Sequence, residues 1–191
     1  MHSILLGLAL AAPQSYDVLI SAGHEGRPAS CSRFPGRACN LGASGERAWT
    51  PVVADESARR LRAMGYTVAR EPADFTGVYD VEAAIFIHFD GSTAACTSGA
   101  SIGYRGVASR NAARLWRRTY AAVFPFRFQP DDFTQGLRDY YGFRAVRARK
   151  GALVLELGEL TCPAQRRWLA PRLHRIGDLI AAFVRRLIGT R

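Results

Sequence analysis

Residues 83–88 read AAIFIH, a continuous apolar run that ends directly in a histidine. An apolar run without polar alternation is typical of a strand that is buried on both faces of a sheet. Residues 152–156 (ALVLE) show the same pattern with Glu156 at the end, and residues 16–21 (YDVLIS) are followed closely by His24. Three buried strands that each lead to a metal-binding or proton-moving side chain predict a sheet with a functional site at one edge.

Helical patterns alternate with these strands along the chain. Thr50 and Pro51 precede an apolar face, so we expect them to be the N-cap and the first residue of a helix. Apolar residues also recur at helical spacing over residues 107–124 and about 164–188, while residues 66–69 (YTVA) predict another strand. This alternation predicts a single α/β domain, a three-layer α/β/α fold around a central, mostly parallel (mixed) sheet.

The composition limits the classes of function. The chain has 191 residues, 48% of them hydrophobic, which suits one globular domain, and no apolar run reaches the ~20 residues of a transmembrane helix. A net charge of +10 favours an anionic partner such as nucleic acid, a membrane surface or a wall polymer. Arginines on solvated helix faces explain the charge equally well. Because no nucleic-acid-binding motif accompanies it, we predict no nucleic-acid partner.

The N-terminal segment reads like the apolar part of a secretory signal. Residues 3–12 (SILLGLALAA) are apolar, and residues 9–11 (ALA) resemble a cleavage site, although no positive charge precedes them. An edge strand of the domain is the alternative interpretation. We therefore divide the chain into residues 1–14, a signal peptide or N-terminal extension, and residues 15–191, a catalytic domain in the cell envelope, periplasmic or secreted.

The four cysteines agree with an oxidising compartment. None of them forms a Cys-x-x-Cys pair, which argues against a cysteine-based zinc site. Cys31 and Cys39 enclose one loop, while Cys96 and Cys162 each lie a few residues beyond a predicted strand end at the site. We expect two disulfides, Cys31–Cys39 and Cys96–Cys162.

The residues at the strand ends have the chemistry of a catalytic zinc site. In open α/β sheets, ligands bind at the carboxyl ends of the strands. Two neutral imidazoles, here His24 and His88, and one carboxylate leave a fourth zinc position open for water. Zinc lowers the pKa of that water, and a second carboxylate must then move its proton to the leaving nitrogen. The sequence therefore predicts a zinc hydrolase with two functional carboxylates.

The same residues resemble a known family, the zinc-dependent N-acetylmuramoyl-L-alanine amidases. Residues 22–26 (AGHEG) are similar to its Gly-His-Gly-Gly motif, and residues 87–90 (IHFD) to its Ser-Ile-His-x-Asn motif. Residues 153–163 (LVLELGELTCP) are similar to its Leu-Val-Glu-x-Gly-Phe-Leu-Thr-Asn segment. The resemblance implies zinc bound by His24 and His88, Glu156 as the catalytic carboxylate, and peptidoglycan or a muropeptide as substrate.

The family also has a glutamate as third metal ligand, at the start of the stretch that leads into the first helix. Glu46 and Glu56 are both candidates. The resemblance favours Glu46, because it lies well upstream of the Gly-x-x-Val turn at residues 65–68. Glu56 lies among charged residues in the predicted helix, where a solvated face is the simpler interpretation.

Three acidic residues depart from the family pattern. Glu25 replaces a glycine, Asp90 an asparagine and Glu159 an aromatic residue, and any of them could alter the substrate or the metal shell. Two alternatives to a peptidoglycan amidase therefore stay open: a zinc hydrolase of another amide or peptide, and a non-catalytic module of the same fold that binds the wall. The sequence does not predict the oligomeric state.

Overall fold

The central sheet has six strands, five of which follow the order β3-β2-β4-β6-β5, while β1 pairs with β4. The structure is a computed structural model that describes residues 12–31 and 39–190. All pairings are parallel except that of β5 with β6. The predicted mostly parallel, mixed sheet is therefore confirmed. The strands are β1 (Gln14–Ser15), β2 (Val18–Ala22), β3 (Val68–Glu71), β4 (Tyr79–Asp90), β5 (Ala100–Tyr104) and β6 (Val146–Glu159).

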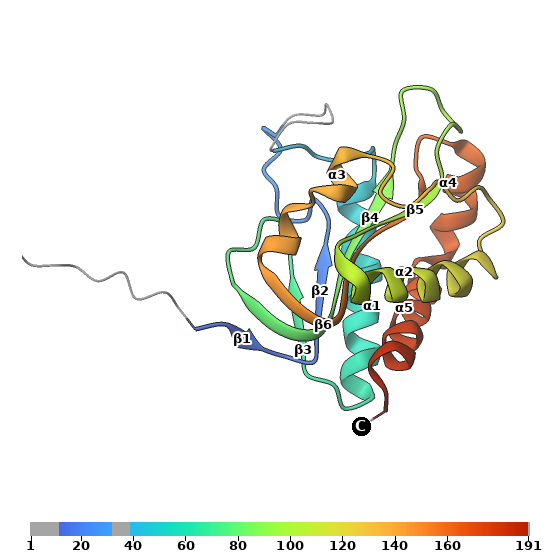
Figure 1. Cartoon of the computed structure of the whole chain (residues 1–191). Helices are drawn as coiled ribbons and strands as arrows, with labels where there is room; N and C mark the ends of the chain where they lie inside the picture. The colour runs from blue at the N-terminus through green and yellow to red at the C-terminus, as the bar shows by residue number, and fades with distance from the viewer. Residues whose placement is uncertain (1–11, 32–38, 191) are drawn as a thin grey trace, which may run out of the picture.

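Helices cover both faces of this sheet (Figure 1). The three long helices, α1, α2 and α5, pack together on one face over the larger hydrophobic core. The short α3 and η1, drawn in orange, cover the other face. The predicted three-layer α/β/α architecture is thus confirmed. The helices are α1 (Glu46–Ala63), α2 (Gly106–Ala121), α3 (Gln135–Arg138), η1 (Tyr141–Arg144), α4 (Pro163–Leu169), η2 (Ala170–Arg172) and α5 (Leu173–Ile188).

Alternation along the central strands places the site on one side of the sheet. Successive side chains of a strand point to opposite faces. In β4, Ile85 and Ile87 join the core under the long helices, whereas Phe86 joins the core under α3 and η1. His88 follows Phe86 by two residues and therefore lies on the face of α3 and η1.

Two predicted helix boundaries were wrong. Helix α1 begins at Glu46 rather than at Thr50, and Pro51 lies inside it. Thr50 does not cap the helix, because its hydroxyl donates to the carbonyl oxygens of Gly23 (2.7 Å) and Glu46 (3.1 Å). The single helix predicted over 164–188 is two helices, α4 and α5, separated by η2 at Pro171. Proline lacks the N–H that a continuous helix needs at that position.

Both expected disulfides are present. Cys31 is bonded to Cys39, and Cys96 to Cys162, so all four cysteines are paired. The signal predicted over 1–14 falls mostly outside the described residues and stays a prediction, although Gln14 and Ser15 pair with β4 as β1. In the part of the chain that the structure describes, no helix is long and apolar enough to span a membrane.

Candidate metal centre

The predicted strand-end residues come together because β2, β4 and β6 are neighbours. His88 on β4 lies directly opposite Glu156 on β6 in the parallel register. The chain leaves β2 at Ala22, and the N–H of Gly23 still donates to the carbonyl of Ile87 (2.8 Å). This bond holds the turn that includes His24 against β4. The three side chains therefore lie at the same edge of the sheet.

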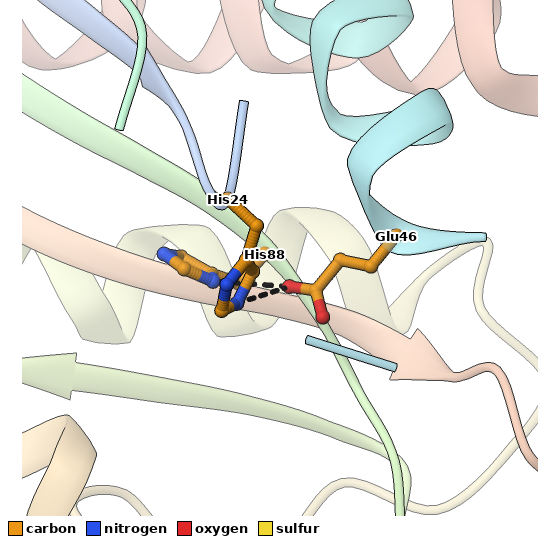
Figure 2. A group of neighbouring side chains, drawn as sticks. All are labelled: His24, Glu46 and His88. Carbon is orange, nitrogen blue, oxygen red and sulfur yellow. Dashed lines mark hydrogen bonds and ion pairs between the residues drawn. The ribbon is translucent and has the colours of Figure 1, made fainter. Parts of the chain in front are cut away.

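Helix α1 brings Glu46 to the two histidines (Figure 2). Its Oε1 lies 3.3 Å from Nε2 of His24 and 3.0 Å from Nδ1 of His88. All three side chains are buried, and their ligand atoms lie within 4.8 Å of one another. In a tetrahedral zinc site with bonds of about 2.0–2.1 Å, ligand atoms are separated by about 3.3 Å. The separations of the Glu46 oxygen from the two imidazole nitrogens are close to that value.

Two glycines leave room for this arrangement. A Cβ atom at Gly42 would collide with the carboxylate of Glu46 and with the ring of His24, and one at Gly23 would overlap the ring of His88. Gly42 also adopts a φ of +69°, in the left-handed region that favours glycine. The backbone around the group therefore permits the close approach of the three candidate ligands.

The protonation states of the group suit a cation. Burial opposes the ionised form of Glu46, but hydrogen bonds with His24 and His88 outweigh it and lower the pKa to about 2. Backbone N–H groups of Ala43 (2.8 Å) and Phe89 (3.1 Å) also donate to its carboxylate. Burial lowers the pKa of His88, which therefore stays neutral. A neutral imidazole beside an ionised carboxylate is the state in which both bind metals.

Contacts on the far side of His24 hold its ring. Its Nδ1 lies 2.9 Å from the carbonyl oxygen of Asn40 and 3.0 Å from a guanidinium nitrogen of Arg27, and such outer contacts orient an imidazole that binds a metal. Arg27 donates to the same carbonyl (2.9 Å) and is itself held by two 2.7 Å bonds to Asp74. His24 adopts a φ of +60°, a strained conformation for a residue other than glycine. Sequence reasoning missed Arg27, since an isolated loop arginine gives no local signal.

Glu156 lies in the same cavity as the metal-binding group. The cavity has a volume of about 960 Å³ and is also lined by Asp90 and Tyr140. Oε2 of Glu156 is buried and has no hydrogen-bond partner within residues 12–31 and 39–190. Burial, together with the negative charges of Asp90 and Glu46, raises the pKa of Glu156 well above its usual range. Such a carboxyl group keeps its proton to a higher pH than a solvated glutamate does.

All three departures from the family pattern have ion-pair or hydrogen-bond partners outside the histidine–glutamate group. Glu25 forms an ion pair with Arg70 (2.7 Å), outside the metal-binding group. Asp90 lines the cavity, where it accepts hydrogen bonds from the hydroxyl of Ser98 and from the N–H of Gly91. Burial raises the pKa of Asp90, although these two hydrogen bonds act in the opposite direction. Neither acid is a member of the histidine–glutamate group.

Glu159, the third departure, is fully buried at the end of β6 and anchors a loop. Its carboxylate accepts bonds from the hydroxyls of Ser92 (2.7 Å) and Thr161 (2.6 Å) and from the N–H groups of Cys96 and Ser98 (both 2.8 Å). Burial opposes ionisation, but these bonds lower its pKa. Glu159 therefore organises the loop after β4, which the Cys96–Cys162 disulfide also ties to β6.

Glu56, the alternative third ligand, lies elsewhere. It is buried between α1 and α5, where it binds Arg59 and Arg60. His174 is exposed beside it, with Nδ1 3.8 Å from a carboxylate oxygen of Glu56. The structure therefore places Glu46, and not Glu56, next to the two histidines.

No protein-family model and no curated protein matches this sequence. Solved structures do match. Cwp6 from Clostridium difficile superposes with a TM-score of 0.66 at 18% identity, over 93% of this chain and only 30% of Cwp6. The catalytic domain of CwlV, an N-acetylmuramoyl-L-alanine amidase from Bacillus (Paenibacillus) polymyxa var. colistinus, gives 0.61 at 16% identity, over 88% of this chain and 96% of that domain.

A third match is AmiC2, the N-acetylmuramoyl-L-alanine amidase of Nostoc punctiforme. It gives a TM-score of 0.62 at 15% identity and covers 92% of this chain and 98% of that one. Identities this low establish the architecture and not the activity. The chain has the fold of the N-acetylmuramoyl-L-alanine amidases.

Proposed function

We propose that this protein is a zinc-dependent amidase that cleaves the bond between N-acetylmuramic acid and L-alanine in peptidoglycan. In this proposal His24, Glu46 and His88 bind the zinc ion and Glu156 moves the proton. The observation that supports it most is the buried His24–Glu46–His88 group, which lies beside Glu156 in a fold shared with amidases of that specificity. A location in the cell envelope and a wall or muropeptide substrate belong to the same proposal.

The residues divide the chemistry between them. When bound, zinc supplies a Lewis acid that lowers the pKa of water and polarises a carbonyl group. Glu156 takes a proton from the water that attacks the amide carbon and delivers it to the leaving nitrogen. Its raised pKa favours the protonated form that the delivery step needs, and a cation bound nearby would lower that pKa. Its buried, unpartnered Oε2 is available for this proton.

The non-catalytic wall-binding alternative receives less support. That alternative depends on the acids at positions 25, 90 and 159 having replaced the catalytic machinery. Glu25 and Glu159 instead have partners outside the metal-binding group. His24 and His88, together with the carboxylates of Glu46 and Glu156, remain in the cavity.

Glu156→Gln tests the proposed mechanism directly. The change keeps the shape of the side chain and removes its ability to move a proton, so we expect release of stem peptides from purified walls to fall by about 10²–10⁴-fold. Zinc content, measured by elemental analysis, should match that of the unmodified protein.

Other results would exclude the proposal in distinct ways. A folded wild-type protein that binds no zinc would favour the wall-binding module. Stoichiometric zinc without release of stem peptides would instead indicate another amide as substrate. Full activity in the Glu156→Gln variant would assign the proton transfer to a different residue.

A further inference from the structure

Tyr140 contacts the candidate metal centre, although no pattern in the sequence around it predicts that contact. It lies between α3 and η1, and its hydroxyl is 3.1 Å from Nε2 of His88. The opposite ring nitrogen, Nδ1, faces Glu46 at 3.0 Å. One side of the His88 ring thus faces the other candidate ligands and the other side faces a single hydroxyl.

Aromatic contacts hold the Tyr140 ring in place. Its centroid lies 4.9 Å from that of Phe86, 4.7 Å from Tyr141 and 5.8 Å from Phe143. The ring of His88 meets it at 5.4 Å with an interplanar angle of 81°. The hydroxyl is therefore held against His88 by a packed ring.

The two candidate histidine ligands are supported by different kinds of group. Nδ1 of His24 lies near two groups, the Asn40 carbonyl, which can only accept, and the Arg27 guanidinium, which can only donate. A tyrosine hydroxyl both donates and accepts. At His88 a single hydroxyl can therefore serve either tautomer of the ring.

We propose that Tyr140 is a positioning residue for His88, whose hydroxyl accepts a hydrogen bond from Nε2–H when Nδ1 binds the metal and donates to Nε2 when Nδ1–H faces Glu46 alone. This inference rests on the proposed zinc site. A reversible partner keeps the buried ring satisfied in both states, where an unpartnered ring nitrogen would be costly. It also fixes the orientation of the His88 ring in the zinc-bound state, as hydrogen bonds to the second nitrogen of a metal-binding histidine usually do.

Tyr140→Phe removes only the hydroxyl and preserves the ring that packs on Phe86. We expect zinc affinity, measured by competition with a chromophoric chelator, to fall by about 10–100-fold. Tyr66→Phe is the matched control, because it removes a hydroxyl that donates to the carbonyl oxygen of Gly189, and neither residue lines the cavity. Its zinc affinity should equal that of the unmodified protein. Circular dichroism on both variants checks that each is folded.

A second measurement needs no variant. Long-range ¹⁵N–¹H NMR spectra of the zinc-loaded wild-type protein identify which imidazole nitrogen carries the proton. We expect a protonated Nε2 on His88 and a protonated Nδ1 on His24. If His88 binds zinc through Nε2, or if Tyr140→Phe binds zinc as tightly as the wild type, the assignment of Tyr140 is overturned.

These readouts separate the role of Tyr140 from the reaction catalysed. Zinc affinity and tautomer are measured without any wall substrate. A protein that shows both expected results but releases no stem peptide would contradict the proposed activity and support the role of Tyr140. A wild-type protein that binds no zinc would overturn both.

Discussion

Helix α1 contains two buried glutamates that look alike by exposure and by pKa but differ in what surrounds them. Glu46 at its start and Glu56 further along are 2% and 9% exposed, and both have a pKa lowered to about 2. Arginine side chains stabilise the ionised form of Glu56, with Arg59 and Arg60 bonded to its carboxylate. Imidazoles and backbone N–H groups do so for Glu46.

The difference separates a structural carboxylate from one that can bind a metal. Arginine is charged at all relevant pH values, so the charge of Glu56 is already balanced. The pKa of His88 is lowered, which leaves that ring neutral and the negative charge of Glu46 without a fixed counter-charge. A buried, unbalanced carboxylate attracts a cation, and its imidazole neighbours supply further ligands.

We expect the largest difference between the two glutamates when each is exchanged for glutamine and zinc affinity is measured. For Glu46→Gln we expect zinc affinity to fall by more than about 100-fold, because a charged metal ligand is lost and not merely an outer contact. Glu56→Gln should leave zinc affinity unchanged. Chelator competition on both variants measures this, and equal losses in the two would show that Glu46 has no special relation to the metal.

The glycines that pack against each glutamate offer a milder comparison. Gly42→Ala places a methyl group against the Glu46 carboxylate at a φ of +69°, and Gly177→Ala places one 2.8 Å from Cβ of Glu56. We expect Gly42→Ala to lower zinc affinity about tenfold or more. Gly177→Ala should instead reduce stability by about 1–3 kcal/mol through overpacking between α1 and α5.

Thermal melts and zinc titrations of both glycine variants provide the check. The expected pattern is reciprocal: a metal defect at one glycine and a stability defect at the other. A loss of zinc affinity in Gly177→Ala would mean that the helix interface and the metal centre are coupled.

The smallest expected effect is a pH dependence at Glu56. Hydrogen bonding with Arg59, the largest cause, lowers its pKa from 4.5 to about 2. Its stabilising contribution is therefore complete above pH 4.5 and is lost as the pH falls from 4.5 toward 2. Because its arginine partners are half exposed, we expect Glu56→Gln to cost only about 1 kcal/mol at neutral pH.

Urea denaturation at several pH values tests this expectation. The difference in free energy of unfolding between wild type and Glu56→Gln should be constant near neutrality and should shrink in acid. A difference that stays the same down to pH 3 would show that the arginines do not lower the pKa of Glu56.

The sequence was sufficient to predict the central strands and the edge of the sheet where the site lies. Apolar runs without alternation can only be satisfied by burial on both faces, so 83–87 and 152–155 were identified as strands. The edge strand β5, with the sequence ASIGY, was not predicted. Its short run lacks a strong period, and it pairs antiparallel with β6 at the edge of the sheet.

The outer contacts of the site were beyond sequence reasoning. Tyr140 lies in the 125–150 region, whose aromatic, arginine and glycine content has no clear period. It reaches His88 because α3 and η1 fold over the sheet, a tertiary event without a local signal. The helix boundary at Glu46 was missed because a threonine–proline pair is a common helix start. Here the Thr50 hydroxyl instead donates a hydrogen bond to the carbonyl oxygen of Gly23.

The register of β4 on β6 also makes the site a reporter of folding. His88 and Glu156 come from distant parts of the chain and become opposite partners only when the two strands pair in the native alignment. A slip by one residue would turn one of them to the other face of the sheet. Recovery of the proposed amidase activity after dilution from denaturant, which needs both His88 and Glu156 in place, would therefore measure how fast these two strands find their correct pairing.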